Sequence, residues 1–235
     1  RDIDGFGNDR KNTLTGNDGD NVLKGAGNDD ILYGKDGDDK LDGGDGRDEM
    51  RGGRGDDVYV VNRSDDIVVE AENNGQDTVR STANCRLPGH VESLVLTGSA
   101  SVDATGNALN NTLQGNAGDN VLTGGLGSDQ LDGGLGTDVF IFADAIDSGP
   151  GAGRDVIASI ESGTDKIDVS AIDADYTTDG DQAFVFIGTA TFTETAGELR
   201  YADGIVAGDI SGDAEADLEI NIQDLSLLVA SDFIL

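Results

Sequence analysis

Residues 43–60 read GGDGRDEMRGGRGDDVYV, which is two units of nine residues that share one pattern. Each unit opens with two glycines, carries aspartate at its sixth place and one large apolar residue, Met50 or Tyr59, at its eighth. The same frame divides residues 7–60 into six units without a gap, and residues 106–141 into four more. Ten units in one frame identify an internal repeat, and such periods indicate solenoid architectures.

Three places of the unit have distinct physical roles. Glycine supplies backbone conformations with positive φ and lets neighbouring turns approach closely. The sixth place offers a side-chain oxygen beside the carbonyl oxygens of the glycine turn. The eighth place lies in a short strand and points inward, because side chains alternate along a strand. These inward anchors are Leu14, Leu23, Leu32, Leu41, Met50, Tyr59, Leu113, Leu122, Leu131 and Phe140.

The repeat predicts an all-β fold, a parallel β-roll in which two nonapeptides form one coil of a right-handed β-solenoid. Turns on the same edge of the roll are then 18 residues apart in the sequence. Cations are expected between the turns of Asp30 and Asp48, of Asp39 and Asp57, and of Asn120 and Asp138.

The oxygen-rich turns indicate calcium, which takes six to eight oxygen ligands from carboxylates and backbone carbonyls. The formal net charge is −32, from 47 acidic and 15 basic residues, so divalent cations are the natural counter-charge. A few apolar anchors do not offset the entropy of ordering the arrays. We therefore expect calcium binding and folding to be one event. The same charge excludes nucleic acid as a partner, since phosphate binding requires clustered Lys and Arg.

The arrays resemble the G-G-x-G-x-D-x-U-x repeats of RTX (repeats-in-toxin) proteins. The resemblance implies a calcium-binding β-roll that leaves Gram-negative bacteria through type I secretion. It also implies that the sixth-place side chains and the carbonyls of the glycine turns are the metal ligands. In the first array these are Asp30, Asp39, Gly43, Gly44, Asp45, Gly46, Asp48, Gly52, Gly53, Gly55 and Asp57. In the second array they are Asn120, Gly124, Gly125, Gly127, Asp129, Gly133, Gly134, Gly136 and Asp138.

The first units of each array depart from the motif. Asparagine stands at the sixth place in Asn12, Asn21, Asn111 and Asn120, where it offers a neutral oxygen. We interpret these units as weak or vacant sites and as caps. Cation filling is predicted to be best around residues 43–57 and 124–138.

The chain divides into four parts: residues 1–60 and 106–141 with the arrays, a spacer at 61–105, and a C-terminal region at 142–235. The spacer has strand-like runs without the glycine–aspartate turn, and its 45 residues are a multiple of nine, which is compatible with one continuous roll. Its acidic residues Asp65, Asp66 and Glu70 are interpreted as solvated turn residues, with metal binding as the less favoured alternative. The C-terminal region reads as β-strands separated by acidic turns, a β-rich cap over the open end of the roll.

The C-terminal region also resembles that of serralysin-type secreted metalloproteases, over residues 135–173 and again over the last thirty or so residues. The resemblance implies a calcium site made from Asp147, Asp155 and Asp165. It also implies that the final residues, SDFIL, form an uncleaved export signal for the type I secretion machinery.

A second acidic loop contains Asp209, Asp213 and Asp217. It has the look of a cation loop, but Ile220 stands where an EF-hand has glutamate.

No catalytic motif is visible in the sequence. His90 is the single histidine, which excludes an H-E-x-x-H zinc helix within these residues, and no G-x-S-x-G motif is present. Cys85 is the single cysteine, so no internal disulfide forms. No apolar run is long enough to span a membrane. We predict that this segment is not an enzyme.

The predicted function is a calcium-binding module that folds on extracellular calcium and directs type I secretion of a larger bacterial protein. The chain begins with Arg1 rather than methionine, which suggests that an N-terminal cargo, such as a metalloprotease, lipase or epimerase, is absent. Alternatives are an adhesin-like repeat module and binding of an acidic, alginate-like polysaccharide. The polysaccharide alternative rests on the basic residues of the first array, Lys24, Lys35, Lys40, Arg47, Arg51 and Arg54.

Overall fold

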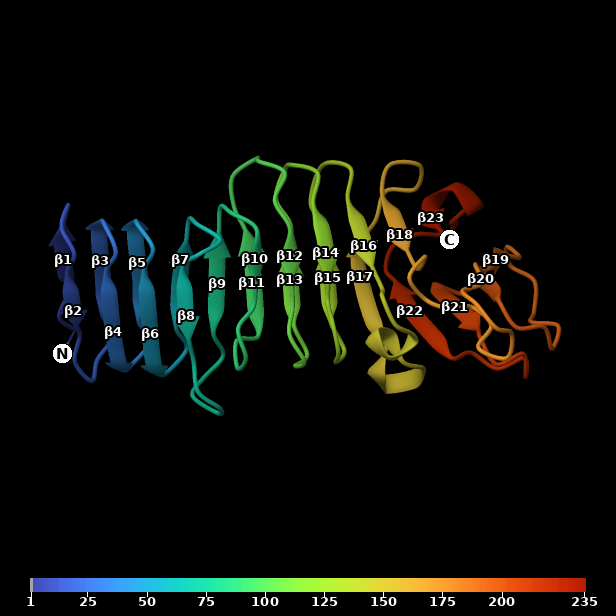
Figure 1. Cartoon of the computed structure of the whole chain (residues 1–235), viewed down its shortest axis with the longest axis horizontal. Helices are drawn as coiled ribbons and strands as arrows, with labels where there is room; N and C mark the ends of the chain where they lie inside the picture. Colours follow the sequence, from blue (N-terminus) through green and yellow to red (C-terminus); the bar gives the residue numbers. More distant parts are fainter. Residues whose placement is uncertain (1) are drawn as a thin grey trace.

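The nonapeptide folds as its pattern predicts: each glycine turn is followed by a short strand that carries the apolar anchor. A computed structural model describes residues 2–235 (Figure 1). The strands of the first array are β1 (Gly5–Asn8), β2 (Thr13–Thr15), β3 (Val22–Gly27), β4 (Ile31–Asp36), β5 (Lys40–Asp45), β6 (Glu49–Arg54) and β7 (Val58–Val61). Those of the second array are β13 (Thr112–Gln114), β14 (Val121–Thr123), β15 (Gln130–Asp132) and β16 (Val139–Ile141).

Alternate strands form the two faces of the roll. On one face, β1, β3, β5 and β7 begin a 13-stranded sheet that continues through β9 (Thr78–Ser81), β11 (Ser93–Leu96), β13, β15 and β17 (Asp155–Ser159). On the other face, β2, β4, β6 and β8 (Ile67–Val69) form a four-stranded sheet. The neighbours are parallel and one coil apart, so that Leu23 is opposite Leu41 and Leu32 is opposite Met50. The structure confirms the all-β parallel roll, which Figure 1 shows as a row of stacked coils.

The spacer supplies further strands to the same stack. They are β8 (Ile67–Val69), β9 (Thr78–Ser81), β10 (Cys85–Arg86), β11 (Ser93–Leu96) and β12 (Ala104–Thr105). In the large sheet Tyr59 is opposite Val79, Val79 is opposite Leu94, and Leu94 is opposite Leu113. The period between facing anchors is therefore irregular in the spacer, although the sheet itself is uninterrupted.

The opposite face of the roll is interrupted in the spacer. Its first sheet ends with β8, and a separate six-stranded sheet begins with β10 and continues through β12, β14, β16, β18 (Lys166–Asp168) and β23 (Phe233–Ile234). The two arrays are therefore joined by hydrogen bonding on one face only.

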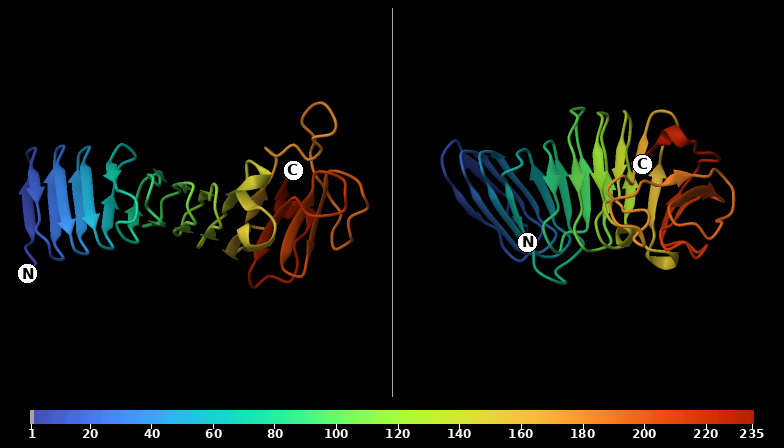
Figure 2. Two further views of the ribbon diagram at one scale, coloured as in Figure 1. Left: turned by 90° about the horizontal axis from the view of Figure 1, so that it is seen from below. Right: turned by 45° about the vertical axis from the view of Figure 1, so that its right-hand side comes forward.

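The C-terminal region covers the end of the roll that follows the second array, as the orange and red segments of Figures 1 and 2 show. Strands β17 and β18 continue the two faces, β22 and β23 pair with them, and β20, β21 and β22 are antiparallel. The elements are η1 (Ala145–Ser148), η2 (Gly151–Gly153), β17 (Asp155–Ser159), β18 (Lys166–Asp168), β19 (Val185–Phe186), β20 (Glu198–Ala202), β21 (Ile205–Asp209), β22 (Leu218–Ile222), η3 (Ala230–Asp232) and β23 (Phe233–Ile234).

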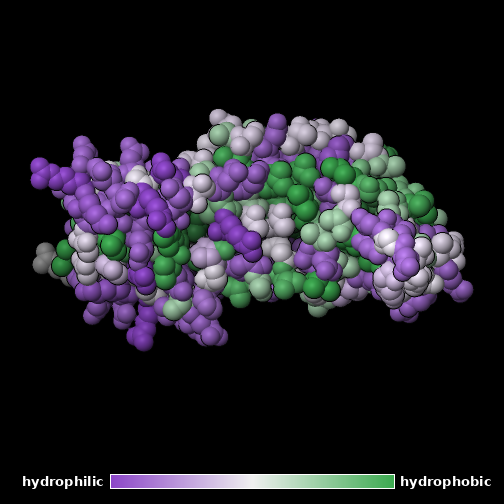
Figure 3. All heavy atoms as spheres, viewed as in Figure 1, coloured by the Kyte–Doolittle hydropathy of each residue, from purple (hydrophilic) through white to green (hydrophobic). Residues whose placement is uncertain are grey.

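The core is a narrow column of anchors along the axis of the roll. Leu41, Met50, Leu131 and Phe140 are completely buried, and every anchor except Leu14 is at most 1% exposed. Leu14, near the N-terminal end of the stack, is only partly buried. The surface over the first array is strongly hydrophilic, whereas apolar side chains show on the face of the second half (Figure 3). Among the described residues, no helix has the length and apolar character needed to cross a membrane.

Candidate calcium sites

The sixth-place side chains stack into two ladders, one along each edge of the roll. The Oδ1 atom of each ladder aspartate accepts a hydrogen bond from the backbone N–H of the ladder residue one coil earlier, as Asp57 does from Asp39 at 2.7 Å and Asp48 from Asp30 at 2.8 Å. The first ladder precedes the strands of the large sheet and contains Asn21, Asp39, Asp57, Asp77 and Glu92, and then Asn111, Asp129 and Asp155. The second precedes the strands of the two smaller sheets and contains Asn12, Asp30, Asp48 and Asp66, and then Asn120, Asp138 and Asp165.

The other oxygen of these carboxylates lacks a protein partner at many rungs. The buried Oδ2 atoms without a hydrogen bond are those of Asp30, Asp39, Asp48, Asp57, Asp77, Asp129 and Asp155. Burying a charged oxygen without a partner is costly, so native structures pair such atoms or place a metal beside them. These rungs therefore fit a cation.

The glycine at the first place of the unit keeps the space beside these oxygens open. A methyl carbon placed on Gly25 would overlap Asp30 Oδ2 and would lie 2.5 Å from the carbonyl oxygen of Gly43. On Gly34 it would overlap Asp39 Oδ2 and lie 2.7 Å from the carbonyl oxygen of Gly52. Each such space is lined by a carboxylate and by a carbonyl from the next coil, which is the hard oxygen donor set that calcium prefers.

Other glycines of the turns adopt the left-handed conformation that favours glycine. Positive φ occurs at Gly44, Gly46, Gly53, Gly55, Gly125, Gly127, Gly134 and Gly136. The first-place glycines Gly43, Gly52, Gly124 and Gly133 are needed for close approach instead, because an added methyl would overlap a carboxylate oxygen. Asp45 is exposed at the third place of its turn.

Burial raises the pKa of the ladder carboxyls well above the ordinary value for aspartate. Desolvation is the largest cause, and neighbouring carboxylates add to it, while the backbone N–H bond at each rung acts against it. The pKa values are about 8 for Asp57 and Asp155, about 7 for Asp77 and Asp129, and about 6 for Asp39, Asp48 and Asp138. The pKa of Asp30 is raised as well. Ionised carboxylates at these places therefore require a positive counter-charge.

At the sixth place, Asn21, Asn111 and Asn120 use both side-chain atoms in hydrogen bonds within the protein. Asn120 Oδ1 accepts from Asn116 N–H at 2.9 Å, and Asn120 Nδ2 donates to the Val102 carbonyl at 2.7 Å. Asn111 Nδ2 donates to the carbonyls of Val91 and Glu92. An asparagine bound in this way has its side-chain hydrogen bonds satisfied within the protein and adds no negative charge to the ladder.

The structure does not bring Asp147, Asp155 and Asp165 together in one site. Asp155 Oδ1 belongs to the first ladder, Asp165 Oδ1 to the second, and the two ladders lie on opposite edges of the roll. Asp147 lies on the side of Asp155, where its Oδ2 accepts from the N–H groups of Ala143 and Asp144. The single site that the metalloprotease resemblance implies is therefore corrected: Asp155 and Asp165 each continue one ladder.

The acidic loop of residues 209–217 satisfies its own carboxylates. Asp209 accepts from the N–H groups of Gly212 and Ala214, at 2.6 and 2.9 Å, and Asp217 Oδ2 accepts from Ile210 at 2.8 Å. These bonds describe a closed turn, and they give no support to a cation there.

Three ladder residues of the spacer were not predicted: Asp66 keeps the nine-residue frame but its unit has no glycine turn, and Asp77 and Glu92 lie outside the frame. Asp66, interpreted as solvated, and Asp77 and Glu92, not singled out at all, accept from the N–H groups of the preceding rungs. Residues 75–80 follow the shorter motif G-x-D-x-U-x, and this motif could have identified Asp77 as a ladder residue. Glu92 has no such signal.

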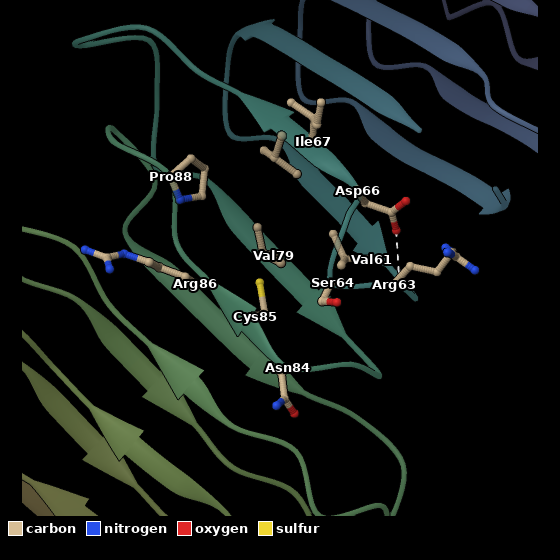
Figure 4. Close-up of a pocket in the computed structure, with 11 residues that line it drawn as sticks. Val61, Arg63, Ser64, Asp66, Ile67, Val79, Asn84, Cys85, Arg86 and Pro88 are labelled. Carbon is tan, nitrogen blue, oxygen red and sulfur yellow. Dashed lines mark hydrogen bonds between the residues drawn. The ribbon is translucent and has the colours of Figure 1, made fainter. Parts of the chain in front are cut away.

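A cavity of about 200 Å³ lies where the second face is interrupted, between β8 and β10 (Figure 4). Val79 and Cys85 line it, and Asp66 accepts from Arg63 N–H at its rim. Burial raises the pKa of the Cys85 thiol to about 11, so the thiol stays protonated at neutral pH. A protonated thiol is a poor nucleophile.

Arginines of the first array contact acidic neighbours. Arg51 pairs with Glu49 at 2.7 Å, and Arg54 lies 3.7 Å from Asp36. These contacts fit charge compensation within the array.

The family model of the RTX calcium-binding nonapeptide repeat matches the chain four times, over residues 6–41, 25–59, 33–68 and 105–140. No curated protein sequence matches the chain. Among solved structures, the extracellular lipase LipA from Serratia marcescens is similar over 95% of this chain and 40% of the lipase chain, at 16% identity and a TM-score of 0.26. The chain thus spans well under half the length of that lipase.

The two matched regions are the two arrays whose turns carry the ladders, and repeats of this family bind Ca²⁺. They form a structural calcium-binding module. Both arrays of this chain are thus RTX calcium-binding nonapeptide repeats.

Proposed function

We propose that this chain is a calcium-triggered folding module that directs the type I secretion of a larger bacterial protein and stabilises it outside the cell. The observation that carries the proposal is the set of buried carboxylate oxygens without protein partners along both ladders. A chain with this feature and a net charge of −32 is expected to be unfolded where calcium is scarce.

The folding step follows from the ladders. Bound calcium supplies the positive charge that the buried oxygens lack. The sixth-place aspartates then hold successive coils together through their Oδ1 atoms, and the eighth-place anchors become buried. Ion binding and folding are thus coupled.

The position of the C-terminal tail supports a role in export. Phe233 and Ile234 form β23, which pairs with β18 through Ile167 and Asp168. The tail is therefore accessible in the unfolded chain and held in a sheet in the folded one. We propose that the secretion machinery binds it before the roll forms.

Far-UV circular dichroism during a calcium titration tests the folding role. The spectrum in excess chelator is expected to be that of a disordered chain, and millimolar calcium is expected to produce the β signal. Magnesium at equal concentration is the control for ionic strength and divalent charge. A folded spectrum that persists unchanged in excess chelator would reject the proposal.

Export is tested separately, in a Gram-negative host that expresses a type I exporter and a passenger fused ahead of residues 1–235. Removal of residues 231–235 is expected to retain the passenger inside the cell. Calcium-induced folding of the purified truncated protein is measured in parallel. Undiminished export of the truncated fusion contradicts the tail's role, whatever the folding result.

The polysaccharide alternative gains no support from the structure, since Arg51 and Arg54 contact carboxylates of their own array. Calorimetry with acidic glycans tests it through the double variant Arg47→Ala and Arg51→Ala. Binding that this variant loses while calcium-induced folding is retained would favour the alternative.

A further inference from the structure

One group of three carboxylates combines a residue of the last unit of the first array with two residues of the spacer. It consists of Asp57, Glu70 and Asp77, and one oxygen from each lies within 4.8 Å of the other two. Among residues 2–235 no other group of three acidic, histidine or cysteine side chains converges in this way.

The two aspartates present unsatisfied oxygens in this group. Asp57 and Asp77 are each 1% exposed, and the Oδ2 atom of each is buried without a hydrogen-bond partner. Their Oδ1 atoms are already used, since they accept from Asp39 and Asp57 N–H at 2.7 and 2.9 Å. The free oxygens are therefore available to a ligand, and three adjacent carboxylates demand that the ligand be a cation.

Glu70 reaches this place because the repeat is broken there. It lies 18 residues, or one coil, after Gly52, where the repeat would again have a first-place glycine. In the regular coils that glycine contributes a carbonyl oxygen, as Gly52 itself does beside Asp39. At residue 70 the chain instead provides a carboxylate on a longer side chain.

Tyr59 holds the glutamate in position. Its hydroxyl donates to Glu70 Oε1 and accepts from Gly52 N–H at 2.7 Å. Backbone N–H groups of Gly53 and Ala71 add weaker contacts to the two Glu70 oxygens, at 3.4 and 3.2 Å. Tyr59, the anchor of the last unit in the first array, thus orients the Glu70 carboxylate, which stands where a regular coil has glycine.

We propose that Asp57, Glu70 and Asp77 form an additional calcium site that joins the first array to the spacer. Calcium suits the site better than magnesium, because magnesium retains several waters and the two aspartates are almost fully enclosed. The site uses three carboxylates where a regular turn uses sixth-place carboxylates with glycine carbonyls. It goes beyond the proposed folding function, since two of its three carboxylates, Glu70 and Asp77, lie in the spacer, outside the arrays.

The first test counts bound calcium ions by native mass spectrometry of the full chain. Glu70→Gln, which preserves the shape of the side chain, is expected to bind one ion fewer than the unaltered protein at the same free calcium. Glu72→Gln is the matched control, because Glu72 is exposed in the same loop and its substitution removes the same charge. Circular dichroism at saturating calcium establishes that both variants form the roll.

An equal ion count in Glu70→Gln and the unaltered protein overturns the proposal. An equal loss in both variants also overturns it, because the effect would then be one of overall charge.

Anomalous diffraction from crystals of the unaltered protein grown with calcium provides a result that does not depend on variant folding. A peak is expected among the three carboxylates, with oxygens at roughly 2.3–2.6 Å. Peaks in the regular turns without one at Asp57, Glu70 and Asp77 refute this site and leave the calcium-folding function intact. Absence of all peaks in an ordered roll refutes both.

Discussion

At the scale of single residues, each unit separates two tasks within one carboxylate. Oδ1 of a ladder aspartate joins neighbouring coils through a backbone N–H, as Asp48 does with Asp30. Oδ2 of the same side chain faces the space that the first-place glycine leaves open. One side chain therefore both links neighbouring coils and leaves a second oxygen without a protein partner, which suits an ion between them.

The turn glycines make a residue-scale prediction. Gly125 has φ of 95°, and a methyl carbon there would lie 2.5 Å from the Asn107 carbonyl oxygen. Gly125→Ala is expected to destabilise the calcium-bound roll by about 1–2 kcal/mol from the left-handed backbone alone, and further through the overlap. Urea denaturation at fixed calcium measures the loss. Gly89→Ala is the control, since nothing lies within 4 Å of its added methyl, and an equal effect of the two changes would contradict the argument.

The raised pKa values predict how acid affects the metal-free chain. The unfolded value is 3.8, whereas the pKa values of Asp57 and Asp155 in the folded state are about 8 and that of Asp48 is about 6. A raised pKa means that the folded state binds protons more tightly than the unfolded state. The stability contributed by these groups is therefore present below about pH 4 and lost as the pH rises through 6 to 8.

Circular dichroism in excess chelator measures this effect. The β signal is expected to increase as the pH falls from 8 towards 4. Addition of 1 M salt at pH 8 is the control, because it screens exposed charges far more than buried ones. A spectrum that is independent of pH would refute the linkage.

At the scale of elements, the strands of the second array are three residues long and each has one fully buried side chain. Leu131 in β15 is completely buried, whereas Leu135 in the following turn is 73% exposed. Leu131→Ala is expected to cost about 2–5 kcal/mol, and Leu135→Ala about 0.5 kcal/mol or less. Chemical denaturation at saturating calcium compares the two, and similar losses would show that the anchors do not hold the stack.

The elements also show what could be predicted from the sequence. The glycine frame predicted the strands and anchors of both arrays, because each coil repeats the same local chemistry. The spacer was harder, since facing anchors such as Tyr59 and Val79 depart from the 18-residue period and the frame no longer locates the ladder. The contact between Tyr59 and Glu70 depends on that departure, and no local pattern predicts it.

At the scale of the whole molecule, repulsion between negative charges destabilises a fold that has few apolar contacts. The net charge is −32, and the core is one column of side chains inside an elongated stack (Figure 2). Coils of a solenoid contact only their neighbours, so stability depends on each interface in turn. Calcium is therefore expected to control the dimensions of the entire chain.

Small-angle X-ray scattering checks this expectation. In excess chelator the radius of gyration is expected near 50 Å, roughly the value for an unfolded chain of this length. Calcium is expected to reduce it to that of the elongated roll. Raising the sodium chloride concentration alone is the control. Identical scattering curves with calcium and with chelator would contradict a calcium-dependent shape.

The ladder bonds also have a direction. At each regular rung the N–H donor precedes its carboxylate acceptor by one coil, as Asn21 precedes Asp39 and Asp39 precedes Asp57. If the chain folds from its C-terminal end, the Oδ1 acceptor of each rung is therefore already in place when the preceding coil folds and donates its N–H. If coils are added in that order, each new coil would oppose backward movement of the chain. Folding itself would then favour movement in one direction for a polypeptide that emerges with its C-terminus first.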